Sequence, residues 1–182
     1  RNSKKLISLH EIKKLSKNLR NKINNDFEII IKKNINFSKL NFKKIPNVMG
    51  ILNLTPDSFS DGGKFNKNNK GLIHANRISK FGADIVDIGG ESTRPGSKAI
   101  SVTEEWNRIE KIIKKIDKKI PLSLDTRKSE IMNKGIQIGV KLINDVSGLE
   151  YDSKTINVLK KYKIPFVIQH SQGTPENMQI NP

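Results

Sequence analysis

Short apolar segments recur along the sequence from residue 48 onward, and polar residues follow each of them at once. The first, VMGILN, runs into the loop TPDSFSDGG, and the later ones end in DIGGES, SLDT, INDV and FVIQH. Segments with helical periodicity, at about 70–81, 104–118, 128–138 and 153–162, separate them. Such continuously apolar strands are typical of a parallel sheet covered by helices. The sequence therefore predicts an α/β fold of repeated strand–loop–helix units.

The polar residues at the strand ends favour one α/β architecture over another. They are Asn53, Asp87 with Glu91, Asp125, Asn144 with Asp145, and His170. Each predicted strand has such residues at its C-terminal end, as in a (β/α)8 TIM-barrel, whereas an open doubly wound sheet concentrates them at one switch point. Five strands are found and a barrel has eight. Residues 46–182 are therefore predicted to form the N-terminal part of a TIM-barrel domain, incomplete as it stands.

Residues 1–45 carry a different pattern and are predicted to form an N-terminal extension. Apolar residues recur at helical spacing on one face of residues 1–25, namely Leu6, Leu9, Ile12, Leu15 and Leu19. Strand-like runs at 27–31 and 36–43 follow and predict a hairpin or a pair of cover strands. Further along the chain, Thr103 is expected to cap the helix at 104–118, and Gly82 and Gly139 are expected to end helices.

Composition excludes several classes of protein. The 182 residues carry 34 Lys and Arg against 18 Asp and Glu, a net charge of +16. These charges are spread along the whole chain, so the sequence predicts no nucleic-acid partner. It has no run of about 18 apolar residues and no signal peptide, so no membrane partner is expected. The absence of cysteine suits a reducing compartment, and a cytoplasmic location is predicted.

Asp125 and Asn144 are the strongest candidate site residues. They end adjacent predicted strands and supply a carboxylate acceptor together with an amide that both donates and accepts hydrogen bonds. Such a pair suits a flat, amide-like ring. Two other interpretations stay open: Asp125 could cap the helix that starts near Lys128, and Asn144 could be a buried amide with all its hydrogen bonds made.

The motifs ILNLTPDSFSDGG, ADIVDIGGESTRPG, SLDT, INDV and GTPENMQ, in this order, resemble those of the dihydropteroate synthase family of the folate pathway. The resemblance runs from about Asn47 to Pro182. It implies a TIM-barrel transferase that joins 6-hydroxymethyl-7,8-dihydropterin diphosphate to p-aminobenzoate and releases pyrophosphate. It also implies a Mg²⁺ cofactor, sensitivity to sulfonamides and a possible homodimer.

The resemblance assigns roles to individual residues. Asn53 matches the magnesium-contacting position, Thr93 contacts the diphosphate-bearing substrate, and Asp125 and Asn144 hold the pterin. The p-aminobenzoate pocket takes Ser58, Phe59, Arg94 and Pro95. The residues implied in catalysis are Asp125, Asn144 and Asp61. Asp61 lies on the first loop, and its carboxylate could stabilise a pterin methylene cation. His170 matches a histidine beside the family's fifth strand, for which a structural or pocket-lining role is favoured over that of general base. A solvated loop arginine is the alternative for Arg94.

Two other functions stay open at this point. One is a non-catalytic pterin-binding remnant that needs a partner, and the other is a pterin-dependent methyltransferase barrel. The family's motifs on its last three strands are not in the sequence, so the 182-residue chain alone is expected to make no dihydropteroate.

Overall fold

The computed structural model describes residues 8–32, 36–37, 40–41, 46–55, 70–94, 96–117 and 119–169. The chain divides into two units, Arg1–Ile35 and Asn36–Pro182. In the described parts of the chain, no helix combines the length and the apolar character needed to cross a membrane.

The first unit contains the helices α1 (Leu9–Ile12) and α2 (Lys17–Ile31). Ser8 begins α1 in a capping box, because its hydroxyl accepts from the Glu11 amide and its own amide donates to the Glu11 carboxylate. The strand predicted at 27–31 is wrong, since these residues form the last turns of α2. A short apolar run does not by itself distinguish strand from helix, and no Gly or Pro interrupts residues 17–31.

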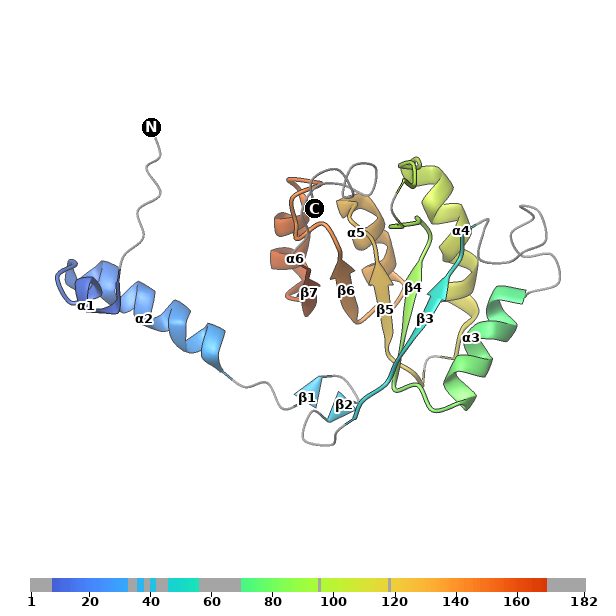
Figure 1. Ribbon diagram of the computed structural model, residues 1–182, viewed down its shortest axis with the longest axis horizontal. Helices are drawn as coiled ribbons and strands as arrows, with labels where there is room; N and C mark the ends of the chain where they lie inside the picture. Colours follow the sequence, from blue (N-terminus) through green and yellow to red (C-terminus); the bar gives the residue numbers. More distant parts are fainter. Residues whose placement is uncertain are drawn as a thin grey trace. The chain divides into compact units, whose positions relative to one another are not determined.

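The second unit begins with a small antiparallel pair, β1 (Asn36–Phe37) and β2 (Leu40–Asn41). Both strands lie within the single run predicted at 36–43, so the predicted pair of strands at 27–31 and 36–43 is not formed. The strand–loop–helix units follow (Figure 1). They are β3 (Met49–Asn53), α3 (Lys70–Lys80), β4 (Ile85–Gly89), α4 (Val102–Lys115), β5 (Leu122–Asp125), α5 (Ser129–Gln137), β6 (Leu142–Asp145), α6 (Thr155–Tyr162) and β7 (Phe166–Ile168). Sheet order equals chain order, β3-β4-β5-β6-β7, and every pair is parallel.

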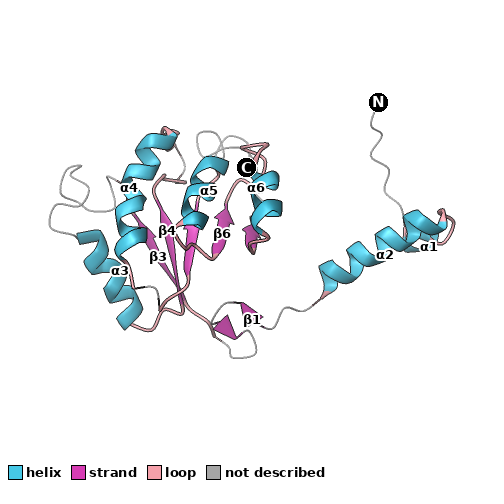
Figure 2. Ribbon diagram, turned by 180° about the vertical axis from the view of Figure 1, so that it is seen from behind, coloured by secondary structure: helices cyan, strands magenta, loops and turns pink. Residues whose placement is uncertain are grey.

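The helices cover one face of this sheet, as the view from behind shows (Figure 2). The residues on that face lie in one row across four strands and have no exposed surface: Leu52, Ile88, Leu124 and Ile143. Apolar residues of α4 and α5, including Ile109, Ile113 and Ile131, belong to the same core. On the opposite face Ile51 is 63% exposed. The helices that the structure describes therefore cover one face of the sheet, as in part of a barrel wall.

Helix ends follow local rules with one correction. Gly82 ends α3 at φ 98°: its amide donates to Ser79 O and the Ala83 amide to Ile78 O, which is a Schellman motif. Gly139 ends α5 in the same way. The predicted cap of α4 is wrong, because the Ser101 hydroxyl, and not Thr103, accepts the Glu104 amide at 3.1 Å. Both residues can cap, and the helix starts one residue before Thr103.

Candidate active site

Three of the predicted site residues lie in a single row across the uncovered face of the sheet. The strand register places Asn53 beside Gly89, Gly89 beside Asp125, and Asp125 beside Asn144. Each is at or next to the C-terminal end of its strand. The prediction that these strand ends converge on one mouth is confirmed for these three residues.

Gly89 leaves an opening in the middle of this row. A Cβ atom there would lie 3.3 Å from Asn53 Oδ1 and 3.3 Å from Asp125 Oδ2. The two oxygens are thus no more than twice that distance apart, with no side chain from β4 between them. The arrangement presents an amide oxygen and a carboxylate oxygen side by side at the mouth of the sheet.

A second carboxylate lies one row deeper. Asp87 is 4% exposed, and its Oδ2 accepts a hydrogen bond of 3.0 Å from Asn144 Nδ2. Because β5 lies between β4 and β6, this bond passes over a strand whose side chain at that level is the small Ser123. Asp87 therefore ties the predicted amide to the floor of the site. The sequence places Asp87 among the strand-end residues but gives it no role.

Electrostatics make Asp125 unusual. Burial raises the pKa of Asp125 to about 7, and the carboxylates of Asp87, Glu105, Asp145 and Glu91 add to the effect in that order. Burial also raises the pKa of Asp87, although Ser123 and Asn144 partly oppose it. Among the described residues, Asp125 Oδ1 is a buried oxygen that accepts no hydrogen bond. Buried acceptors of this kind suit a ligand with hydrogen-bond donors.

Thr93 and Arg94 lie in the loop that begins directly after the row, between β4 and α4. Thr93 is half-buried and Arg94 is exposed. The loop is folded on itself: the Ser97 hydroxyl donates to Ser92 O at 2.6 Å, and the Ser97 amide donates to Arg94 O at 3.1 Å. The loop thus holds a hydroxyl and a guanidinium near the C-terminal end of β4.

A buried ionic network anchors this loop, and sequence reasoning missed it. The Glu91 carboxylate accepts from Arg127 Nε, Lys128 Nζ and the Ile100 amide, each at 2.9 Å. Lys128 Nζ also donates to Glu105 Oε2 at 2.6 Å. Burial alone would raise the pKa of Glu91, but the donors outweigh it and hold the pKa below its usual value.

Further contacts complete the network. The Thr126 hydroxyl donates to Glu105 Oε1 at 2.6 Å, and Arg108 Nη1 donates to Gly90 O at 2.7 Å. Arg108 is also paired with Glu104. The network joins the loops after β4 and β5 to α4, so it fixes the backbone on which Thr93, Arg94 and Asp125 lie. The charged residues of GGES and DTRK, which follow the neighbouring strands β4 and β5, are visible in the sequence, but their burial and pairing are not.

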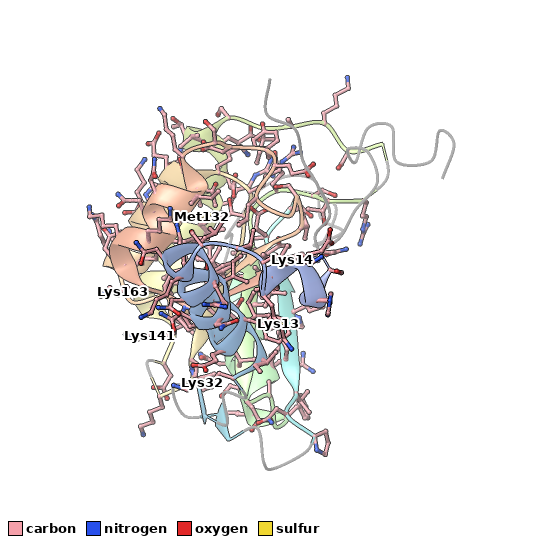
Figure 3. All side chains as sticks on the ribbon, turned by 90° about the vertical axis from the view of Figure 1, so that its left-hand side faces the viewer. Lys13, Lys14, Lys32, Met132, Lys141 and Lys163 are labelled. Atoms are coloured by element: carbon pink, nitrogen blue, oxygen red, sulfur yellow. The ribbon has the colours of Figure 1, made fainter. Side chains whose placement is uncertain are left out.

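Other predicted site residues lie outside the described residues: Ser58, Phe59, Asp61, Pro95 and His170. The described residues contain no group of three His, Cys, Asp or Glu side chains that could hold a metal ion. The charge of the chain is spread over its surface: the lysines labelled in Figure 3 are all exposed, namely Lys13, Lys14, Lys32, Lys141 and Lys163.

Residues 49–182 match the family model described as pterin binding enzyme. The chain is 43% identical to the dihydropteroate synthase of Bacillus subtilis over 137 residues, which are 74% of this chain and 48% of that protein. The chain therefore spans about half the length of this curated relative.

Solved structures agree with the match. The dihydropteroate synthase of Yersinia pestis, solved with a sulfonamide drug complex, has a TM-score of 0.70 at 39% identity over 81% of this chain and 54% of that chain. That of Xanthomonas albilineans, in complex with 7,8-dihydropteroate, has a TM-score of 0.60 at 36% identity over 70% of this chain and 46% of that chain. These likenesses confirm the α/β fold and the partial barrel. With its five parallel strands and the row of polar residues at their ends, the chain belongs to the pterin binding enzyme family.

Proposed function

We propose that this chain acts in dihydropteroate synthesis, a transferase reaction that joins a pterin diphosphate to p-aminobenzoate. The observation that carries the proposal is the buried, unpartnered carboxylate oxygen Asp125 Oδ1, which lies beside Asn144 in the strand register. The relative from Xanthomonas albilineans, crystallised with 7,8-dihydropteroate, supports the choice of product.

Asp125 is proposed to hold the pterin ring. The aminopyrimidinone edge of a pterin offers two neighbouring N–H donors, and an ionised carboxylate accepts two such bonds side by side. Without a ligand, the pKa of about 7 leaves Asp125 partly protonated at neutral pH. Donors from the ring favour the ionised form, so pterin binding lowers this pKa.

The chemical step forms one bond and breaks another. The amine nitrogen of p-aminobenzoate attacks the pterin methylene carbon, the carbon–oxygen bond to the diphosphate breaks, and the new secondary amine loses one proton. Positive charge develops on the methylene as the diphosphate leaves. The carboxylate of Asp125, ionised when the ring is bound, and that of Asp87 one row deeper put negative charge at the mouth, which stabilises the cation. Arg94, exposed on the neighbouring loop, is proposed to face the carboxylate of p-aminobenzoate.

Magnesium is proposed as the cofactor. Asn53 Oδ1 at the mouth is a hard oxygen donor, and Mg²⁺ bound through few protein ligands completes its shell with water and substrate phosphates. When bound, the ion would neutralise charge on the departing diphosphate. Thr93 is proposed to contact the same diphosphate. Inhibition by sulfonamides, a homodimer and a cytoplasmic location are further proposals from the family resemblance.

The test is calorimetric titration of the 182-residue chain with 6-hydroxymethyl-7,8-dihydropterin diphosphate and Mg²⁺. Binding is the readout because the chain alone is expected to make no dihydropteroate. Asp125→Ala should weaken binding by about 2–4 kcal/mol, the scale of a lost buried hydrogen bond to a charge. Asp26→Ala, which removes an exposed carboxylate on α2, should leave the affinity unchanged. Absence of binding, or equal affinity of the Asp125 variant, would overturn the proposal.

A further inference from the structure

The Asn144 side chain is held in one orientation by a residue that lies beneath the site. An amide has its nitrogen and its oxygen on opposite sides, and an ionised carboxylate can only accept hydrogen bonds. The 3.0 Å bond from Asn144 Nδ2 to Asp87 Oδ2 therefore requires the nitrogen to face Asp87. It follows that Asn144 Oδ1 faces away from Asp87, where it can accept a hydrogen bond from a ligand.

Asp87 is placed to do this without reaching a ligand itself. It lies two residues before Gly89 on β4, so it is one row deeper than the row of Asn53, Asp125 and Asn144. It is 4% exposed, and its partner in the register on β5 is Ser123, whose side chain is too small to block the path over that strand. No other hydrogen bond to the Asn144 side chain is found among the described residues.

We propose that Asp87 is a positioning residue, which fixes the Asn144 amide so that its oxygen accepts a hydrogen bond from the bound ring. Asp87 acts through Asn144 and selects a ligand with a donor at that position. A ring with an acceptor there would meet the amide oxygen and be rejected. This inference rests on the proposed function, since it assumes that a pterin-type ring occupies the mouth of the sheet.

The first test concerns orientation and needs no ligand. The method is NMR of the 182-residue chain. The side-chain NH₂ signals of Asn144 are identified as those that are missing from the spectrum of Asn144→Ala. The rate at which these hydrogens exchange with water is then measured at about pH 8.5. Asp87→Ala removes the acceptor and should speed this exchange by about tenfold or more, the factor for a lost hydrogen bond of ordinary strength. Asp87→Asn keeps an acceptor oxygen at the same reach and should restore slow exchange.

Two further variants keep the orientation test decisive. Asp26→Ala removes an exposed carboxylate on α2 and should leave the exchange of the Asn144 side chain unchanged. Asp87→Ser is too short to reach Nδ2 but keeps a polar group, so it replaces Asp87→Ala if that variant fails to fold. If exchange of the Asn144 side chain is unchanged in Asp87→Ala, or in Asp87→Ser where that replaces it, the inference is overturned. It is also overturned if exchange in Asp87→Asn is as fast as in Asp87→Ala.

The second test uses 6-hydroxymethyl-7,8-dihydropterin diphosphate as the probe, at the same pH so that Asp125 is ionised in every variant. Asp87→Ala should weaken binding about tenfold, and Asp87→Asn should stay within about threefold of the unaltered chain. Equal losses in both variants would show that the charge of Asp87 matters and not its acceptor, which overturns the inference. If the unaltered chain binds no pterin, the proposed function fails, and the exchange measurement still decides the role of Asp87.

Discussion

The ammonium nitrogen of Lys128 lies 2.6 Å from Oε2 of Glu105, a residue on α4 with no exposed surface. The same nitrogen is 2.9 Å from Oε1 of Glu91, which lies in the loop after β4. One buried cation is therefore shared by two buried carboxylates, one from a loop and one from a helix. Charges in a protein interior are tolerated when they are paired and hydrogen-bonded, as all three are here. The network therefore makes the two loops that border the candidate site depend on one lysine.

Lys128→Met should destabilise the chain strongly, because it leaves Glu91 and Glu105 with a lost partner in the interior. We expect a loss of roughly 3–5 kcal/mol in the free energy of unfolding, measured by urea denaturation at neutral pH. The matched control is Lys114→Met, which breaks a pair with Glu110 on a lysine whose side chain is 55% exposed. That loss should be below about 1 kcal/mol. Similar losses in the two variants would contradict the importance of the network.

Asp125→Asn should stabilise the folded chain at alkaline pH. The pKa of Asp125 is about 7 in the fold and 3.8 as a free group. Between these values the folded chain keeps a proton that the unfolded chain releases, so the contribution of Asp125 to stability falls as the pH rises and is lost above about 7. The variant removes this penalty and should gain roughly 2–4 kcal/mol at about pH 8.

The gain from Asp125→Asn should disappear below about pH 4, where Asp125 is neutral in both states. Denaturation at a series of pH values measures it. The same variant should bind pterin diphosphate more weakly, because the Asn side chain has one acceptor oxygen beside an NH₂ donor and cannot accept two parallel bonds from the ring. If Asp125→Asn and the unaltered chain have the same free energy of unfolding at alkaline pH, the ionised Asp125 does not destabilise the fold and the prediction is wrong.

Gly89→Ala should close the opening between Asn53 and Asp125. The added Cβ would lie 3.3 Å from an oxygen of each, so both side chains must shift by a few tenths of an ångström. Stability should change by less than about 1 kcal/mol, whereas affinity for the pterin diphosphate should fall about tenfold or more. Calorimetry and denaturation of the same preparation separate the two effects, and unimpaired binding would argue against a ligand at this opening.

Ser101→Ala should weaken the start of α4, because the Ser101 hydroxyl accepts the Glu104 amide at 3.1 Å. The expected cost is about 1 kcal/mol in thermal or urea unfolding. Thr103→Ala, two residues away and inside the helix, should change stability by no more than about 0.5 kcal/mol. The reverse ranking would restore Thr103 as the cap.

Local patterns predicted most of the second unit. Each strand from β3 to β7 was placed within about two residues, since apolar runs bounded by Gly, Pro and polar residues are strong signals. Asn53, Asp125 and Asn144 were found for the same reason, because a strand end is visible in sequence and parallel strand ends meet at one edge. Their exact register, which puts Gly89 between Asn53 and Asp125, required the structure.

Pairing at long range was not predictable in this way. Glu91, Glu105 and Lys128 are far apart in the sequence, and charged residues are mostly exposed, so nothing local marks these as buried. The bond between Asp87 and Asn144 is equally remote, since the two residues are 57 positions apart in the sequence. The run at 27–31 failed for a different reason: its apolar residues fit a strand, and only the helix that precedes it determines their conformation.

The row of Asn53, Gly89, Asp125 and Asn144 means that the site is specified by strand register and not by loop length. A loop that joins a strand to its helix can gain or lose residues while these four positions stay in place. One extra residue inside β5 would do the opposite, because side chains alternate between the two faces of a strand. Asp125 would then point among the helices, into the core with Leu124, and the mouth of the sheet would lose its carboxylate.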